Sequence, residues 1–318
     1  MNVRRLIPST ALAGAVALGI VSLSACSGTS DAADKGSDGK LDVVASFYPM
    51  QYLAEQIGGT HVAVNTLTRP GVEPHDLELK PKQIGELGEA DVILYLKGIQ
   101  PAVDDAIAQA GVKNTVDAAT LTKLEEHGTE VGHDHGTGEE HESEAGADPH
   151  IWLDPVKYAE VAKGVGSALE KADPDHAADY KKNTEALVKK LGDLNTEFET
   201  GLKNTATKTF ITTHSAFGYL AERYGLEQEG ITGIDPESEP SPARIKELQD
   251  IAAKDKVSTV FFETLASDKT AKTLAGDTGL KTDVLDPLEG ITKQSKGDDY
   301  IEVMQSNLAA LKTALGAK

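Results

Sequence analysis

The sequence of 318 residues is poor in cysteine, in aromatic residues and in basic residues. Its single cysteine cannot form an internal disulfide, so the folded chain must be stabilised by packing. Lysine and arginine number 31 against 51 acidic residues, and the resulting formal net charge of −20 argues against a nucleic-acid partner, whose phosphates require a basic face. The apolar fraction of 39% is compatible with an α/β protein of two domains.

Long apolar runs are also missing after the N-terminus. Residues 11–23 form the one apolar stretch near that end, and about 13 residues fall short of the ~20 that a membrane-spanning helix needs. A short apolar stretch after Arg4 and Arg5 is typical of an export signal. It ends in Leu-Ser-Ala-Cys26, which resembles a bacterial lipobox. We therefore predict a lipoprotein signal peptide over residues 1–25 and lipidation of Cys26, the alternative being an uncleaved anchor with an incidental thiol.

After Cys26 the chain divides into a tether and an α/β body. Residues 26–40 are rich in Ser, Gly, Asp and Ala and are predicted to be a flexible tether. From residue 41, short β-branched runs alternate with helical patterns, which indicates mainly parallel sheets covered by helices. The expected strands are residues 41–46, 61–68, 91–96, 209–213, 259–263 and 282–285. The expected helices are residues 50–57, 81–88, 215–224, 242–254 and 267–278. The fold class is therefore α/β, with a first lobe over residues 41–172 and a second over residues 205–318.

A long amphipathic helix is predicted between the lobes, over residues 173–204. Its apolar residues recur at intervals of three, four and seven: Tyr180, Leu187, Leu191, Leu194 and Phe198. Asp173 and Pro174 suit a helix cap and first turn. At 1.5 Å per residue the helix would extend roughly 40 Å, so we expect a stiff connection between the lobes.

One insertion in the first lobe has a composition of its own. Residues 125–147 contain Glu, Asp and Gly with four histidines, which are His127, His133, His135 and His141. Val131 is the only bulky apolar residue, so the segment cannot bury a core and should lie on the surface without fixed structure. We expect its histidines to bind metal weakly; the alternative is a solvated acidic loop with no role.

Three of the other five histidines stand at turns or strand ends. They are His75, His150 and His214. His214 follows the expected strand 209–213, and Asp286 follows the expected strand 282–285. Ligands of open α/β sheets bind at the carboxyl ends of strands, so both residues are candidates for a binding site. His61 and His176 are expected to be structural.

Three imidazoles and one carboxylate are a suitable ligand set for Zn²⁺. A closed site of four side chains leaves no position for an activated water, which favours transport over catalysis. The fourth ligand is expected to be Asp286. Glu263, at the end of the expected strand 259–263, either accepts a hydrogen bond from a ligating imidazole or ends the strand in solvent.

Four short motifs resemble the zinc and manganese substrate-binding proteins of ABC importers, the ZnuA-like lipoproteins of cluster A-I. They are Glu73-Pro74-His75-Asp76, Asp148-Pro149-His150-Ile151-Trp152-Leu153-Asp154-Pro155, Thr213-His214-Ser215-Ala216-Phe217-Gly218-Tyr219-Leu220 and Leu285-Asp286-Pro287-Leu288. The resemblance implies two Rossmann-like lobes joined by one long rigid backbone helix, with metal between them. It implies that His75 and His150 come from the first lobe, and His214 and Asp286 from the second. Because some zinc-type members resembling this chain use a water or a nearby glutamate as the fourth ligand, Glu73 or a water stays an alternative to Asp286.

The resemblance also predicts the function. It implies an extracytoplasmic, non-enzymatic receptor, a monomer anchored to the membrane through Cys26, that captures Zn²⁺ and delivers it to the permease of an ABC importer. An imidazole at His214, where manganese-type members have glutamate, and the His-rich insertion favour zinc over manganese, which stays an alternative. A secreted zinc hydrolase is less well supported, because His141-Glu142 lacks the second histidine of a His-Glu-x-x-His motif. An adhesin is a further alternative for which the sequence offers no specific feature.

Overall fold

A computed structural model describes residues 39–112, 114–127 and 147–318 of the chain. The predicted signal peptide, Cys26 and almost all of the predicted tether lie outside the described residues, as do His133, His135 and His141. No helix in the described part combines the length and the apolarity that a bilayer span requires.

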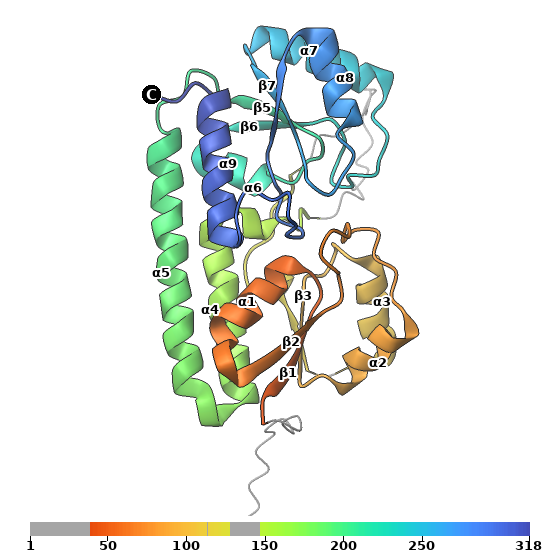
Figure 1. The fold of residues 1–318 in the computed structure, drawn as a ribbon, viewed down its shortest axis with the longest axis vertical. Helices are drawn as coiled ribbons and strands as arrows, with labels where there is room; N and C mark the ends of the chain where they lie inside the picture. Colours follow the sequence, from red (N-terminus) through yellow and green to blue (C-terminus); the bar gives the residue numbers. More distant parts are fainter. Residues whose placement is uncertain (1–38, 113, 128–146) are drawn as a thin grey trace, which may run out of the picture. The chain divides into compact units, whose positions relative to one another are not determined.

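The first lobe is built on a parallel sheet of four strands in the order β2-β1-β3-β4. The strands are β1 (Leu41–Ala45), β2 (Val62–Thr66), β3 (Val92–Tyr95) and β4 (Thr115–Asp117), and the helices are α1 (Tyr48–Gly58), α2 (Pro81–Glu89) and α3 (Pro101–Ala110). Successive residues of β1 point to opposite faces: Val43 packs in the core that includes α1, and Val44 packs with residues of α2 and α3. Helices therefore cover both faces of the sheet (Figure 1).

The second lobe repeats this plan, with a parallel sheet in the order β6-β5-β7-β8. The strands are β5 (Thr209–Thr212), β6 (Glu227–Gly230), β7 (Thr259–Phe262) and β8 (Lys281–Val284), and the helices are α6 (Gly218–Tyr224), α7 (Pro242–Lys254), α8 (Lys269–Thr278) and α9 (Tyr300–Ala314). Ile211 and Val260 pack in one core with α7 and α8, whereas Phe210 and Phe261 pack on the other face.

A long helix, α5 (Ala177–Leu202), lies between the lobes in the sequence and packs along α4 (Pro155–Ala172) and α9 (Figure 1). The five apolar residues predicted for its inner face are all buried, together with Thr184 and Leu202. One continuous hydrophobic core contains residues of both lobes and of all three helices, which makes the connection stiff.

The start of this helix differs in detail from the prediction. Pro174–His176 forms a separate 3₁₀ turn before α5 begins at Ala177. The Asp173 side chain does not cap a backbone N–H of that turn. It accepts hydrogen bonds from His176 Nδ1 at 2.6 Å and from the Tyr180 hydroxyl at 2.9 Å.

The predicted α/β class, with two parallel-sheet lobes and one long helix between them, is confirmed. Every expected strand and helix has a counterpart in the structure. Among the α-helices and strands of the described residues, five were not expected, namely α3, β4, α4, β6 and α9. Strand β6 has the sequence Glu-Gln-Glu-Gly, which contains no apolar residue to indicate a strand.

Candidate metal centre

Three of the predicted residues meet in the structure. His75 lies in the connection between β2 and α2, His150 lies directly before the 3₁₀ turn Ile151–Leu153, and His214 follows β5. Together with Glu289, which follows β8, they are the one group of three or more potential metal ligands in the described residues. Their ligand atoms all lie within 4.8 Å of one another. The group is enclosed, since His150, His214 and Glu289 have relative exposures of 0%, 0% and 1%.

The distances between these atoms fit one small ion. The Nε2 atoms of His75, His150 and His214 lie 3.4, 3.4 and 3.3 Å from one oxygen, Oε1 of Glu289. All four atoms are buried, and none makes a hydrogen bond of ordinary geometry. A tetrahedral ion with ligands at about 2.0–2.1 Å has ligand atoms about 3.3–3.4 Å apart. The three distances from Glu289 therefore match the spacing of ligand atoms around a tetrahedral metal ion.

Each of two histidines is oriented by a carboxylate on its other ring nitrogen. Glu263, directly after β7, is buried and lies with Oε1 2.6 Å from Nδ1 of His214. The same oxygen accepts hydrogen bonds from the Thr213 hydroxyl and the His214 backbone N–H. Of the two roles considered for Glu263, the structure shows the hydrogen bond to a site imidazole, and the side chain does not end the strand in solvent. Its carboxylate holds the proton on Nδ1 and leaves Nε2 free toward the site.

His150 has the corresponding partner in Asp148. Oδ1 of Asp148 accepts from Nδ1 of His150 at 2.7 Å and from its backbone N–H at 2.9 Å. Both side chains are fully buried. This second carboxylate was not singled out from the sequence, although it lies only two residues before His150.

Glu73 lies next to the group without belonging to it. Its Oε1 accepts from the backbone N–H of His75 at 2.8 Å, which fixes the turn that presents this histidine. Burial and the neighbouring Glu289 raise the pKa of Glu73 to about 9, so its carboxyl is protonated at neutral pH.

The expected fourth residue, Asp286, is not in the group, and Glu289 stands in its place. The carboxylate of Asp286 accepts from the backbone N–H of Leu288 in its own loop at 2.9 Å. It also accepts from the hydroxyl of Thr264, in the segment after β7, at 3.1 Å. Glu289 comes three residues later in Leu-Glu-Gly, after the chain has turned toward the histidines. Glu289 could have been considered from the sequence, because it is an acidic residue in the loop that follows the carboxyl end of β8.

Two segments of the site are tied directly to each other. The indole N–H of Trp152 donates to the carbonyl of Pro287 at 2.7 Å, and the Tyr300 hydroxyl donates to the carbonyl of Trp152 at 2.6 Å. The first bond joins the segment that carries His150 to the segment that carries Glu289, and the second joins the His150 segment to α9. These buried hydrogen bonds therefore help to fix the relative positions of the two ligands.

The sequence matches the family described as zinc-uptake complex component A, periplasmic, over residues 43–314. The chain belongs to this family. It is 39% identical over 298 residues to the high-affinity zinc uptake system protein ZnuA of Bacillus subtilis, covering 92% of both chains. It is 38% identical over 288 residues to the zinc-binding lipoprotein AdcA of Streptococcus pneumoniae, covering 87% of this chain and 56% of that longer relative. The Zn(II)-bound ZnuA-like domain of the pneumococcal AdcA has a similar structure, with a TM-score of 0.72, 34% identity, and coverage of 87% and 99%.

In this member of the zinc-uptake family, the buried charges of the centre strongly shift one another's pKa values. Burial alone would raise the pKa of Glu289, but the three imidazoles hold it well below its usual range. Burial alone would lower the pKa of His214, but Glu263 and Glu289 raise it well above its usual range. The pKa of His150 is raised in the same way against burial, chiefly by Asp148. Protons therefore balance the carboxylates until a cation replaces them.

The remaining predicted histidines lie away from this group. His127 is the one histidine of the insertion among the described residues, and its ring contacts Asp148 and Glu222. His61 and His176 stack with ring centroids 3.9 Å apart beside the start of α5, and each has a carboxylate partner. Both are thus engaged in packing near the long helix.

Proposed function

We propose that this family member is an extracytoplasmic receptor that binds Zn²⁺ with His75, His150, His214 and Glu289 and delivers it to the permease of an ABC importer. The observation that carries the proposal is the spacing of 3.3–3.4 Å between one Glu289 oxygen and three Nε2 atoms. Zinc is the cargo of such a receptor, and the protein supplies all four ligands.

The ligand chemistry supports zinc over manganese. Three imidazole nitrogens suit Zn²⁺, whereas Mn²⁺ favours carboxylate, carbonyl and water oxygens. The names of the relatives from B. subtilis and S. pneumoniae refer to zinc uptake and zinc binding, which agrees with this choice.

The enclosed ligand set supports a receptor over an enzyme. A catalytic zinc site keeps one position for a water or a substrate, and four protein ligands fill a tetrahedral ion. His75 follows a strand of the first lobe, and His214 and Glu289 follow strands of the second, so the ion would be captured between the lobes. Because one core runs through both lobes, release would require loop rearrangement more than a wide hinge motion.

The proposal includes anchoring at the membrane. The lipobox ending at Cys26 would leave the folded body outside the cytoplasm, beside the permease that receives the ion. The relative from S. pneumoniae is named a lipoprotein, which supports this arrangement.

Competition between the purified chain and a chromogenic chelator tests the proposal. We expect one tight zinc site, much weaker binding of Mn²⁺, and an affinity at least about 100-fold lower in each of the variants His75→Ala, His150→Ala and His214→Ala, which corresponds to about 2.7 kcal/mol or more. His176→Ala is the matched control and should keep the affinity of the unaltered protein. Equal affinity in all three site variants would defeat the assignment, and tighter binding of Mn²⁺ would favour a manganese receptor.

A further inference from the structure

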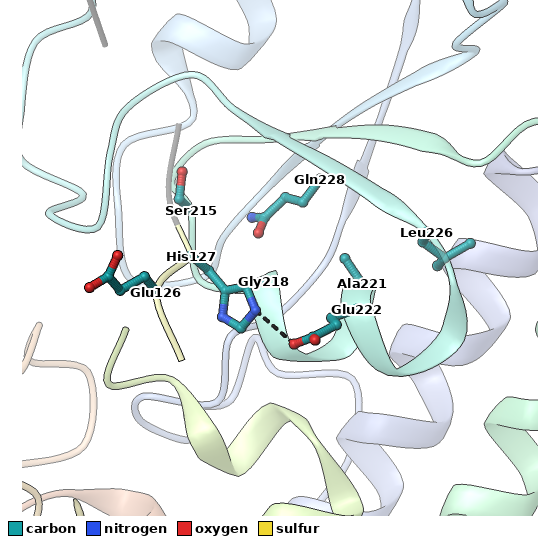
Figure 2. A pocket seen from close by; sticks show the side chains of 8 residues that line it. All are labelled: Glu126, His127, Ser215, Gly218, Ala221, Glu222, Leu226 and Gln228. Carbon is teal, nitrogen blue, oxygen red and sulfur yellow. Dashed lines mark hydrogen bonds and ion pairs between the residues drawn. The ribbon is translucent and has the colours of Figure 1, made fainter. Parts of the chain in front are cut away.

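His127, at the start of the insertion, is held in a defined position by α6 of the second lobe. Its Nδ1 lies 3.1 Å from Oδ2 of Asp148. Its Nε2 lies 3.0 Å from Oε2 of Glu222, and Figure 2 shows this second contact. The rings of His127 and Tyr219 pack in a T-shaped arrangement, with centroids 4.4 Å apart and an interplanar angle of 78°. Both ring nitrogens of His127 therefore face carboxylates, and its ring packs against Tyr219.

The side chain of His127 packs closely against the backbone of Gly218. A Cβ atom added at Gly218 would lie 2.4 Å from Cβ of His127, 2.6 Å from its Cγ and 3.0 Å from Oδ2 of Asp148. The first of these distances is far inside van der Waals contact, so the ring can sit here only because residue 218 has no side chain. This packing is independent of the two hydrogen bonds.

The two ends of the insertion are also closed against each other. The backbone N–H of Asp148 donates to the carbonyl of Glu125 at 2.9 Å. The Tyr219 hydroxyl accepts from the N–H of Glu125 and donates to the carbonyl of Asp148, both at 2.8 Å. His127 thus approaches Asp148 from a fixed backbone position.

Asp148 connects His127 to the metal centre. Its Oδ1 accepts from Nδ1 of His150, and its Oδ2 accepts from Nδ1 of His127. Donors on both oxygens prevent the carboxylate from turning about its Cβ–Cγ bond. The direction of the His150 ring, and of the Nε2 that faces Glu289, depends on that carboxylate.

We propose that His127 is a positioning residue of the metal centre, which fixes Asp148 and through it the ring of His150. This inference rests on the proposed zinc-binding function. It assigns His127 a role different from weak metal binding in the insertion, because a metal on either ring nitrogen would have to displace a carboxylate partner. Glu222 on α6 completes the chain of contacts, so a helix of the second lobe orients a ligand that precedes α4.

Zinc affinity and zinc release rate of variants of the full chain test this role. His127→Ala should lower the affinity about 10-fold, the lower end of the range of 10- to 100-fold that is typical for partners of metal ligands. Gly218→Ala should have a similar effect, since its Cβ displaces the His127 ring. His127→Asn places an amide nitrogen at the distance of Nδ1 and should restore the affinity to within about 3-fold, whereas His127→Gln should not. Glu126→Gln, in the same surface pocket of about 340 Å³, is the control and should leave the affinity unchanged (Figure 2).

Coupling between His127 and Asp148 provides the stricter test. Asp148→Asn alone should weaken zinc binding about 10- to 100-fold, and adding His127→Ala to it should cause little further loss, because both changes break one chain of contacts. Metal-free melting temperatures of all variants separate a folding defect from a site defect.

Three results would overturn the inference. They are unchanged affinity in His127→Ala, a loss that His127→Asn fails to restore, and a loss that adds fully to that of Asp148→Asn. If the unaltered chain binds no zinc, the proposed function fails and this inference fails with it. If the unaltered chain and His127→Ala bind zinc equally tightly, only the inference fails.

Discussion

At the scale of single residues, Glu289 reaches the three histidines because the chain turns sharply just before it. Leu288 is fully buried and has a φ of 58°, a left-handed conformation that is unfavourable for a leucine. The carboxylate of Asp286 accepts the Leu288 N–H and stabilises this turn. The strain is thus located beside the ligand that it positions.

Substitution of the two carboxylates separates their roles. Glu289→Gln keeps the shape of the side chain but removes the charge, and we expect zinc affinity to fall at least about 100-fold, or about 2.7 kcal/mol. Asp286→Asn keeps an acceptor for the Leu288 N–H, and we expect a loss of less than about 10-fold. Chelator competition at pH 7 measures both, and a larger effect of Asp286→Asn would mean that the ligands are wrongly assigned.

The pKa shifts of the site histidines predict the direction of the pH dependence. Before zinc binds, the pKa values of His150 and His214 are raised above the usual value of 6.5. Both rings therefore remain protonated, and positively charged, at pH values somewhat above 6.5. Zinc must displace those protons, and its affinity should therefore fall as the pH falls, beginning above pH 6.5. Competition titrations from pH 8 to pH 5.5 check this, and an affinity that stays constant over that range would rule out histidine ligation.

Of the site residues expected from the sequence, the three histidines converge in the structure, whereas Asp286 does not join them. A histidine at a strand end has a strongly restricted position, and His214 lies where its strand predicted. The path of the chain after Asp286 depends on the turn at Leu288. The spacing of residues along the sequence does not predict this turn, so it did not predict that Glu289 would reach the histidines. Asp148 and His127 meet across an insertion, and that contact depends on α6 closing its two ends.

At the scale of elements, α4 and α5 pack closely because a glycine of one faces a threonine of the other. A Cβ atom at the buried Gly166 of α4 would lie 2.2 Å from Oγ1 of Thr184 on α5. Helix α5 was predictable because its large apolar residues follow the helical period. Helix α4 was not expected, since its buried face includes small residues such as Ala162 and Gly166, which give a weak periodic signal.

Two glycine substitutions test this packing with opposite expected signs. Gly166→Ala should destabilise the protein by about 1–2 kcal/mol, because the clash with Thr184 outweighs the gain in helix propensity. Gly192→Ala is the matched control on the exposed face of α5, where an added Cβ meets no atom within 4 Å, and it should stabilise by about 0.5–1 kcal/mol. Chemical denaturation of the metal-free protein measures both changes. A Gly166→Ala variant as stable as the unaltered chain would contradict this account, because it would show that α4 and α5 can move apart without a loss of stability.

At the scale of the whole molecule, two sheets share the same strand order, and loops that follow strands of both sheets meet at one site. The alternation of strands and helices was sufficient to predict the two lobes, since period-2 and period-3.6 patterns are local properties of the sequence. The convergence of four side chains from distant segments is a property of the packed fold. The core that runs through both lobes, α4, α5 and α9 fixes that convergence.

Anomalous scattering at the zinc absorption edge, from crystals of the zinc-loaded protein, tests the four-ligand centre most directly. The predicted result is one strong peak about 2.0–2.2 Å from Nε2 of His75, His150 and His214 and from Oε1 of Glu289. A peak bound by other side chains, or no peak among these four, would contradict the assignment.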